Sequence, residues 1–199
     1  TLSLKQTGKF FGMSSFYDGS GNLVLRFINP APLQTAGNEY GYTLNGAKIY
    51  IDSGHGNYDS GAVNVNVTHM GGSLFEKNIN WSLANKITDI LRSLGANVCL
   101  TNTQTTYYSL DARIAAAQSY GPNLFIAVHH NAGSATARGP EDYYFSPFSM
   151  TLADKIVNRV AGVFTNNIYG ANVNRGDDFG LYRVTRYLDF PSILVEYGF

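Results

Sequence analysis

Four side chains of this sequence could carry out metal-dependent chemistry. His55 lies in a Gly-His-Gly loop after an apolar run, and His129 lies at the end of the apolar run LFIAVHH. Glu76 begins a long amphipathic segment, and Glu196 ends the apolar run SILVE. Catalytic zinc takes three ligands from histidine nitrogens and carboxylate oxygens and keeps a fourth position open, so two histidines and one glutamate are a sufficient set. The second glutamate could then transfer a proton during hydrolysis of an amide.

Each of these side chains also has a structural explanation. A Gly-His-Gly segment can form a simple turn, and a histidine on a buried strand is commonly a hydrogen-bonded core residue. Glu76 would interact favourably with the helix dipole, and Glu196 could pair with Arg183 or Arg186. We favour the metal site because a parallel sheet would place all four residues at one edge, which separate structural roles do not require. The sequence contains no HExxH motif, so the ligands must come from separate elements.

Predicted strands and helices alternate from Ala47 onward and position these residues. The predicted strands are 48–52, 97–101, 124–130, 141–147, 181–184 and 192–199, and the predicted helices are 76–94, 109–120 and 149–168. The helices are predicted from apolar residues at helical spacing, with Ser109 as an N-cap. This alternation predicts an α/β fold with a mostly parallel sheet. Active sites in such folds form at the carboxyl ends of the strands, where His55, His129 and Glu196 fall.

Composition and charge exclude several classes of function. The 199 residues include 14 basic and 14 acidic side chains and no basic run, which excludes a charge-based surface for nucleic acid or anionic membranes. No run of about eighteen apolar residues occurs, so we expect no membrane span. Cys99 is the only cysteine, which excludes an intrachain disulfide and a cysteine-based metal site. We expect Cys99 to be a small buried residue on its strand.

Residues 1–46 differ from the rest of the chain. Two β-rich runs flank the turn sequence DGSGN, and a Pro-containing, Gly-rich segment follows them. We expect this region to form a β-hairpin and a linker, and residues 47–199 to form the catalytic domain. Because a hairpin alone is marginally stable in water, one interpretation is that it is the end of an upstream β-rich module.

Residues 47–199 resemble the zinc-dependent N-acetylmuramoyl-L-alanine amidases, which are peptidoglycan hydrolases of bacterial cell walls, spores and phages. Five motifs carry the resemblance and occur in the family's order: DSGHGNYDSGA, EKNINWSLANKI, SLDARIAAAQ, FIAVHHNA and PSILVEYGF. The resemblance implies a twisted, mostly parallel sheet with helices on both faces. It also implies hydrolysis of the amide between the lactyl group of N-acetylmuramic acid and the L-Ala of the stem peptide.

The same motifs imply a role for each of the four residues. His55, Glu76 and His129 match the positions of the zinc ligands, and Glu196 matches the catalytic base that activates water. The adjacent His130 falls where the family varies. Neighbouring residues of a strand point to opposite faces of the sheet, so only one of the two histidines can face the other ligands. We therefore expect His130 to point away, toward packing, solvent or substrate.

Two further polar residues are candidates for substrate binding. Asp59 could instead hydrogen-bond within the His55 loop or orient that ligand, and Asn131 could instead cap the turn after His129. Three positions depart from the family pattern without removing a ligand: Ser53, Asn57 and Gln118. The family also continues beyond its last motif with a loop and a closing helix. This sequence ends at Phe199, so we expect that helix to be missing and part of the apolar sheet to be uncovered.

The resemblance also implies a setting for the enzyme. We expect a secreted, extracellular monomer that acts on the cell wall as an autolysin, with Zn2+ as cofactor and peptidoglycan as partner. Residues 1–46 would then be the last part of a wall-targeting module. Two alternative functions stay open: a zinc carboxypeptidase or other peptidase acting on wall peptides, and a non-catalytic peptidoglycan-binding module. The same ligands would serve the peptidase, whereas the presence of all four residues argues against the binding module.

Overall fold

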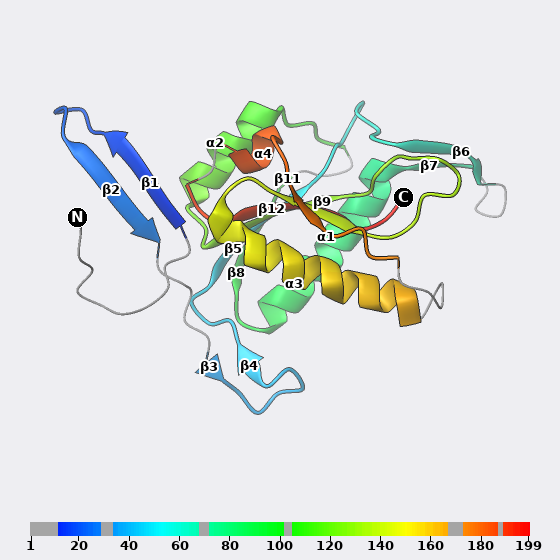
Figure 1. The fold of residues 1–199 in the computed structure, drawn as a ribbon, viewed down its shortest axis with the longest axis horizontal. Helices are drawn as coiled ribbons and strands as arrows, with labels where there is room; N and C mark the ends of the chain where they lie inside the picture. The colour runs from blue at the N-terminus through cyan, green and yellow to red at the C-terminus, as the bar shows by residue number, and fades with distance from the viewer. Residues whose placement is uncertain (1–11, 29–33, 68–71, 102–104, 167–172, 187–188) are drawn as a thin grey trace.

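The centre of the molecule is a six-stranded sheet with the strand order β11-β10-β12-β9-β5-β8 (Figure 1). The computed structural model describes residues 12–28, 34–67, 72–101, 105–166, 173–186 and 189–199. The strands of the sheet are β5 (Lys48–Ser53), β8 (Asn97–Thr101), β9 (Leu124–His129), β10 (Glu141–Tyr144), β11 (Asp177–Phe179) and β12 (Ser192–Glu196). Neighbouring strands are parallel except β10 and β12, which are antiparallel. The predicted α/β fold with a mostly parallel sheet is confirmed.

Helices cover both faces of this sheet (Figure 1). They are α1 (Glu76–Ser93), α2 (Leu110–Tyr120), α3 (Pro147–Phe164) and α4 (Arg183–Arg186). The face under α1 and α3 has Ile51 and Val128 in its core, and the face under α2 and α4 has Tyr50 and Phe125. Because β5 and β9 bury both faces, their sequences are nearly continuous apolar runs instead of alternating ones.

Capping residues set where two of the helices begin. Ser109 accepts a hydrogen bond from the first turn of α2 at 3.2 Å, as its predicted N-cap role requires. Helix α3 begins two residues before the predicted position, because Ser146 accepts a hydrogen bond at 3.4 Å and Pro147 takes the first helical position. The earlier start of α3 also shortens the predicted strand 141–147 to β10.

The predicted strand at 181–184 is wrong, because this segment leads into the helical turn α4. The carbonyl of Tyr182 accepts hydrogen bonds from the backbone N–H groups of Thr185 at 3.2 Å and Arg186 at 3.0 Å. A run of four residues is too short for its periodicity to distinguish a strand from a helix. In this helical turn, Val184 is buried in the core on the face of the sheet that α2 covers.

Two other features differ from the expectations. Cys99 is half-buried instead of buried, because β8 is an edge strand of the sheet. Short antiparallel pairs were not predicted: β3 (Gln34–Thr35) with β4 (Tyr42–Thr43), and β6 (Val63–Val67) with β7 (Gly72–Phe75). Strand β11 at the other edge of the sheet was not predicted either.

The predicted hairpin near the N-terminus is present as β1 (Gly12–Tyr17) and β2 (Leu23–Ile28). The carboxylate of Asp18 holds the turn by accepting hydrogen bonds from the backbone N–H groups of Ser20 and Asn22, each at 2.9 Å. Division of the chain into two units at residue 47 stays a prediction. Residues 1–11 and 29–33 of the predicted hairpin and linker, and residues 167 and 168 of the predicted third helix, lie outside the described residues. No helix in the described part of the chain is both long and apolar enough to cross a bilayer.

One buried carboxyl group lies in the sheet without a partner. Asp142 on β10 is fully buried, and neither of its carboxylate oxygens has a hydrogen-bond partner among the described residues. It lies opposite Val195 in the β10–β12 register, on the face covered by α3. Burial, together with the charges of Asp177 and Glu196, raises the pKa of Asp142 to about 8. Asp142 is therefore mostly protonated in the folded protein at neutral pH.

This raised pKa predicts a pH-dependent stability. The pKa of Asp142 is higher in the folded protein than its ordinary value of 3.8, so the folded state holds a proton that the unfolded chain releases. The contribution of this group to stability is therefore full below about pH 4 and is lost as the pH rises to about 8. Since one pKa unit corresponds to about 1.4 kcal/mol, the loss should be on the order of a few kcal/mol.

We expect Asp142→Asn to reduce the fall in stability between pH 5 and pH 8. Relative to the parent chain, the free energy of unfolding of the variant should therefore be more favourable at pH 8 than at pH 5. Urea unfolding at the two pH values measures it. Asp89→Asn, an exposed position on α1, is the control and should change neither value. An unchanged pH dependence in Asp142→Asn would show that this carboxyl is already ionised in the folded state.

Candidate metal centre

Three potential metal ligands meet at the carboxyl edge of the sheet. His55, Glu76 and His129 each offer one ligand atom, and these atoms lie within 4.8 Å of one another. Oε2 of Glu76 is 3.0 Å from Nε2 of His55, and Oε1 of Glu76 is 3.1 Å from Nδ1 of His129. Within the described ranges, no other group of three such side chains is this close. The structure thus brings together the three residues expected to bind zinc.

The topology of the sheet explains why these residues meet. Strands β5 and β9 are parallel neighbours, with Ser53 in register with Val128, so the chain leaves both strands at the same edge. His129 is the last residue of β9, and His55 follows β5 by two residues. Glu76 is the first residue of α1, which packs across β5 and β9 and points its N-terminus at this edge.

The carboxylate of Glu76 is held by several donors in addition to the two histidines. Its Oε2 accepts a hydrogen bond from the backbone N–H of Ala62 at 2.8 Å. Its Oε1 accepts from the side-chain amide of Asn80 at 3.0 Å and from the backbone N–H of His130 at 3.1 Å. Burial alone would raise the pKa of Glu76, but the hydrogen bonds from His129, His55 and Ala62 outweigh it and hold the pKa far below its usual range. Glu76 is therefore an anion at neutral pH.

Asp59 orients the imidazole of His55. Its Oδ1 is 2.9 Å from Nδ1 of His55, which leaves Nε2 directed at Glu76. A carboxylate on the far nitrogen of a histidine is the usual support for a metal-binding imidazole. This contact is a hydrogen bond within the His55 loop that also orients the ring, and substrate binding by Asp59 stays a prediction. Burial would lower the pKa of His55, but the hydrogen bonds and charges of Glu76 and Asp59 raise it.

Arg113 holds the loop that carries His55 in an unusual backbone conformation. His55 and Asn57 have positive φ values of 64° and 51°, which non-glycine residues seldom adopt. The buried guanidinium of Arg113 donates to the carbonyls of Ser53 at 2.8 Å and His55 at 2.9 Å, and to the carboxylate of Asp52 at 2.7 Å. Asparagine tolerates this region better than most residues, which accommodates Asn57 where the family usually has glycine.

Two glycines make room for the ligands. A Cβ on Gly54 would lie 2.3 Å from Cε1 of His129, because the imidazole packs directly over this position. A Cβ on Gly61 would lie 2.3 Å from Oε2 of Glu76, and Gly61 has a positive φ of 64°. Each site tolerates no side chain while the ligand stays in place.

Glu196 lies beside this cluster, in surroundings that differ from those of Glu76. It ends β12 and is in register with His129 on β9, so the two side chains leave the same face of the sheet. Glu196 is buried, and its Oε2 has no hydrogen-bond partner in the described part of the chain. Burial, then the charges of Glu76 and Glu141, raise its pKa to about 8, against a smaller opposing effect of His55. A carboxyl group with a pKa near neutrality is suited to proton transfer.

Asn131 has a structural role in the described geometry. Its side-chain amide donates to Glu141, and its Oδ1 accepts a hydrogen bond from the backbone N–H of Ala132 at 2.7 Å. Glu141 also accepts from the hydroxyl of Tyr143 at 2.9 Å and pairs with Arg175. These contacts hold the turn after β9, and substrate binding by Asn131 stays a prediction.

His130 points away from the cluster, as the alternation along a strand predicts. Its Nδ1 is 2.8 Å from Oδ1 of the buried Asn80, and its ring lies 6.0 Å from that of Tyr197. Burial, which outweighs the attraction of Glu76, lowers the pKa of His130 to about 4. A neutral His130 thus packs behind the cluster and holds Asn80 against Glu76.

Comparison with known proteins identifies the family. The sequence profile of the N-acetylmuramoyl-L-alanine amidases matches residues 49–199. This chain belongs to the N-acetylmuramoyl-L-alanine amidase family.

Curated relatives of this amidase sequence include proteins of Bacillus subtilis and Staphylococcus epidermidis. It is 32% identical over 156 residues to the uncharacterized protein YqiI of Bacillus subtilis, covering 78% of this chain and 71% of that protein. It is 30% identical over 179 residues to the N-acetylmuramoyl-L-alanine amidase LytC of the same species, covering 89% and 34%. It is 30% identical over 157 residues to the probable cell wall amidase LytH of Staphylococcus epidermidis, covering 78% and 49%. The chain thus spans half or less of the length of LytC and LytH.

Solved amidase structures share the fold. The N-acetylmuramoyl-L-alanine amidase AmiC2 of Nostoc punctiforme superposes with a TM-score of 0.63 at 29% identity, covering 77% of this chain and 79% of that one. The catalytic domain of CwlV from Bacillus (Paenibacillus) polymyxa var. colistinus gives 0.60 at 30% identity, covering 76% and 80%. The similarity covers the α/β sheet of this amidase and the helices that pack on it.

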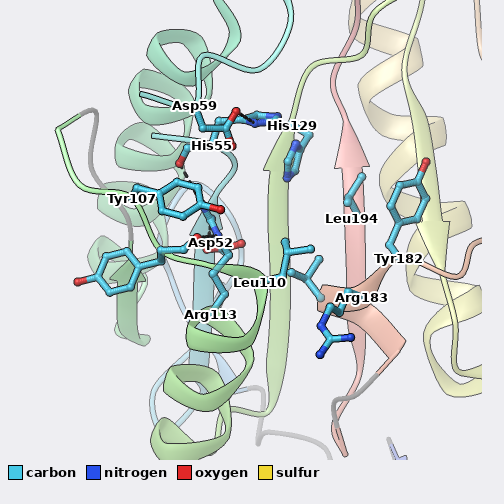
Figure 2. A pocket seen from close by; sticks show the side chains of 12 residues that line it. Asp52, His55, Asp59, Tyr107, Leu110, Arg113, His129, Tyr182, Arg183 and Leu194 are labelled. Carbon is cyan, nitrogen blue, oxygen red and sulfur yellow. Dashed lines mark hydrogen bonds and ion pairs between the residues drawn. The ribbon is translucent and has the colours of Figure 1, made fainter. Parts of the chain in front are cut away.

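A cavity of about 430 Å³ opens beside the metal centre of this amidase (Figure 2). His55 and His129 line it at the top of the sheet, and Leu194 and Val184 line it deeper on the α2 and α4 face. Tyrosines stand at its two sides, with Tyr107 next to the His55 loop and Tyr182 beyond β12. A substrate in this cavity would lie against the proposed metal ligands.

The sequence indicated Asp59 as a possible support for a ligand, but other supporting contacts were not predicted. Asn80 was detectable, because it lies four residues after Glu76 and so on the same face of α1. The pairing of Arg113 with Asp52 joins residues that are far apart in the sequence, and no local pattern indicates it. Glu141 meets Glu196 only because β10 runs antiparallel to β12.

The contact between Gly54 and His129 gives a sharp test of this arrangement. We expect Gly54→Ala to displace the imidazole and to lower zinc affinity by about 10–100-fold, the usual range for disturbed ligand support. Competition titration with a zinc chelator measures the affinity. Gly162→Ala, in the last turn of α3 with nothing within 4 Å of the added Cβ, is the matched control and should leave it unchanged. Equal affinity of Gly54→Ala and the parent chain would show that His129 is not held as a ligand.

Proposed function

We propose that this chain is a zinc-dependent amidase that cleaves the bond between the lactyl group of N-acetylmuramic acid and the L-Ala of the stem peptide. The observation that carries the proposal is the cluster of His55, Glu76 and His129 beside the buried Glu196, whose Oε2 has no hydrogen-bond partner among the described residues. Family membership supports the substrate class. The names of LytC and AmiC2, which specify the same amidase activity, support it as well.

The donor set fits a zinc ion. Two imidazoles and one carboxylate are the ligands of several catalytic zinc sites. The carboxylate of Glu76 is ionised, and Asp59 fixes the ring of His55 with one nitrogen directed at it. When bound there, zinc supplies a Lewis acid that polarises the scissile carbonyl and makes water more acidic.

The chain's own residues then divide the work of amide hydrolysis. Glu196 accepts a proton from the attacking water as the new C–O bond forms. It then gives this proton to the nitrogen of L-Ala as the C–N bond breaks, so the products are a lactyl carboxylic acid and a free amine. Burial raises the pKa of this carboxyl toward neutrality, which suits a group that accepts and returns a proton. Arg113 and Asp59 keep the His55 loop in position throughout.

The proposal also covers where and in what form the enzyme acts. Peptidoglycan lies outside the cytoplasmic membrane, so we propose a secreted, monomeric protein that acts in the cell wall as an autolysin. Residues 47–199 would be its catalytic domain, and residues 1–46 a hairpin and linker at the end of a wall-targeting module.

Product analysis on purified sacculi tests the function directly. We expect new free amino groups on L-Ala, measured by amine labelling and mass spectrometry, and their loss after treatment with a metal chelator. New carboxyl ends within the stem peptide would instead support a peptidase. Binding to sacculi without any new termini would support a non-catalytic module.

The variant Glu196→Gln tests the role of the base separately from metal binding. We expect kcat to fall by about 10²–10⁴-fold, because the amide cannot accept the proton of water, while bound zinc measured by atomic absorption stays the same. Glu39→Gln changes an exposed glutamate that does not line the cavity. It is the matched control and should keep full activity. Activity that survives in Glu196→Gln would move the base to another residue.

The two adjacent histidines should behave differently. We expect His129→Ala to lose bound zinc, and His130→Ala to keep most of it with a loss of stability of about 1–3 kcal/mol from the unsatisfied Asn80. Zinc content and urea unfolding measured on both variants check this. Equal loss of zinc from both would contradict the assignment of His129 as the ligand.

A further inference from the structure

Two exposed tyrosines pack against each other, with their rings tilted, beside the metal centre. Tyr58 is 76% exposed and Tyr107 is 38% exposed, yet their ring centroids are 4.6 Å apart with an angle of 33° between the rings. They come from separate segments, the loop after β5 and the loop before α2. Such a pair presents a broad aromatic surface to solvent, next to the cavity that Tyr107 lines.

The backbone of both tyrosines is held by the network that holds the metal centre. Tyr58 lies between Asn57 and Asp59, inside the loop closed by the bridge between Gly56 and Asp59. Tyr107 precedes Tyr108, whose carbonyl accepts a hydrogen bond from Nε of Arg113 at 3.0 Å. The same arginine holds the carbonyl of His55. The pair is therefore fixed in position relative to the ligands.

Tyr107 and the strand that carries Glu196 lie on opposite sides of His129. In Figure 2, Tyr107 and Asp59 stand on one side of His129, and Leu194 on β12 stands on the other. Glu196 follows Leu194 by two residues on the same strand, and therefore on the same face. A substrate lying across the edge of the sheet would thus have one end at Glu196 and the other at Tyr58 and Tyr107.

The chemistry of the proposed function gives the substrate a direction. Glu196 must deliver its proton to the leaving amine, so the stem peptide has to lie on the Glu196 side of the scissile bond. The acyl part, which is the lactyl group and the sugar that carries it, then lies on the opposite side. That side is where the two tyrosines are.

We infer that Tyr58 and Tyr107 form a stacking platform for the sugar of the muramoyl group; this inference rests on the proposed function. An aromatic ring offers a flat apolar face to the C–H groups of a pyranose, and the tyrosine hydroxyl can donate to and accept from sugar hydroxyls and the N-acetyl group. The platform is uncharged, which suits a neutral glycan better than an ionic group. Its role is to bind and position the glycan, not to take part in proton transfer.

Binding of a peptide-free sugar tests the platform without any hydrolysis. The probe is the disaccharide N-acetylglucosaminyl-N-acetylmuramic acid, titrated into the zinc-loaded chain and followed by NMR. We expect Tyr58→Ala and Tyr107→Ala each to weaken its binding by about fivefold to tenfold. Tyr58→Phe, which keeps the ring, should stay within about twofold of the parent. On sacculi, the alanine variants should raise KM by a similar factor and leave kcat nearly unchanged.

Two control variants locate the effect. Phe148→Ala removes an aromatic side chain with the same exposure as Tyr107, 38%, on α3 at the other face of the sheet, and should bind the disaccharide like the parent. Tyr182→Ala removes a cavity tyrosine on the other side of His129 and should also keep disaccharide binding.

The outcomes separate this inference from the proposed function. Unchanged disaccharide binding in both Tyr58→Ala and Tyr107→Ala, or no binding by the parent chain, would overturn the platform. Weaker binding of the free stem peptide, with sugar binding intact, would overturn it by reversing the direction of the substrate. If the parent binds the disaccharide through these tyrosines but releases no L-Ala amines from sacculi, the platform stands and the proposed function fails.

Discussion

The carboxylate of Glu76 is the group around which this edge of the molecule is organised. A buried anion is costly unless donors surround it, and Glu76 lies where five of them converge: two imidazoles, two backbone N–H groups and the amide of Asn80. Those donors come from the loop after β5, the end of β9 and the first turns of α1. Strand, loop and helix must therefore all be in place before the charge is compensated, and the site forms only in the folded chain.

Carboxyl groups in this sheet take different states because their surroundings differ. Glu76 is surrounded by donors and stays ionised, whereas Glu196 and Asp142 are buried with oxygens that lack partners among the described residues and have raised pKa values. The distance along the sheet from the histidines to Glu196 is short, since β9 and β12 are adjacent. A candidate cation site and a proton carrier can thus lie side by side. Glu76 is ionised because hydrogen-bond donors surround it, whereas Oε2 of Glu196 has no donor among the described residues.

The loop that presents His55 shows how strain at the site is supported. Left-handed conformations at the non-glycine residues His55 and Asn57 are unfavourable, and structures retain them only where the surroundings hold them. Here Arg113 reaches from α2 to the carbonyls of Ser53 and His55 and to Asp52. The guanidinium of Arg113 thereby links helix α2 to the loop that carries His55. It also contacts the carbonyl of Tyr108, next to Tyr107.

The sequence by itself determined most of the fold and the identity of the clustered residues. Apolar runs and helical spacing predicted the central strands and three helices, because burial on one or two faces imposes a period that local residues must follow. Alternation along a strand predicted that only one of His129 and His130 faces the other ligands, and the resemblance to the family indicated His129. The motifs named the four site residues, but they did not place them. Tertiary structure alone decided that 181–184 becomes a helical turn and that β10 runs antiparallel, which brings Glu141 next to Glu196. It also decided the pairing of Arg113 with Asp52 and of Tyr58 with Tyr107. These contacts join residues that are distant in sequence, and their energies depend on burial and packing that no local pattern encodes.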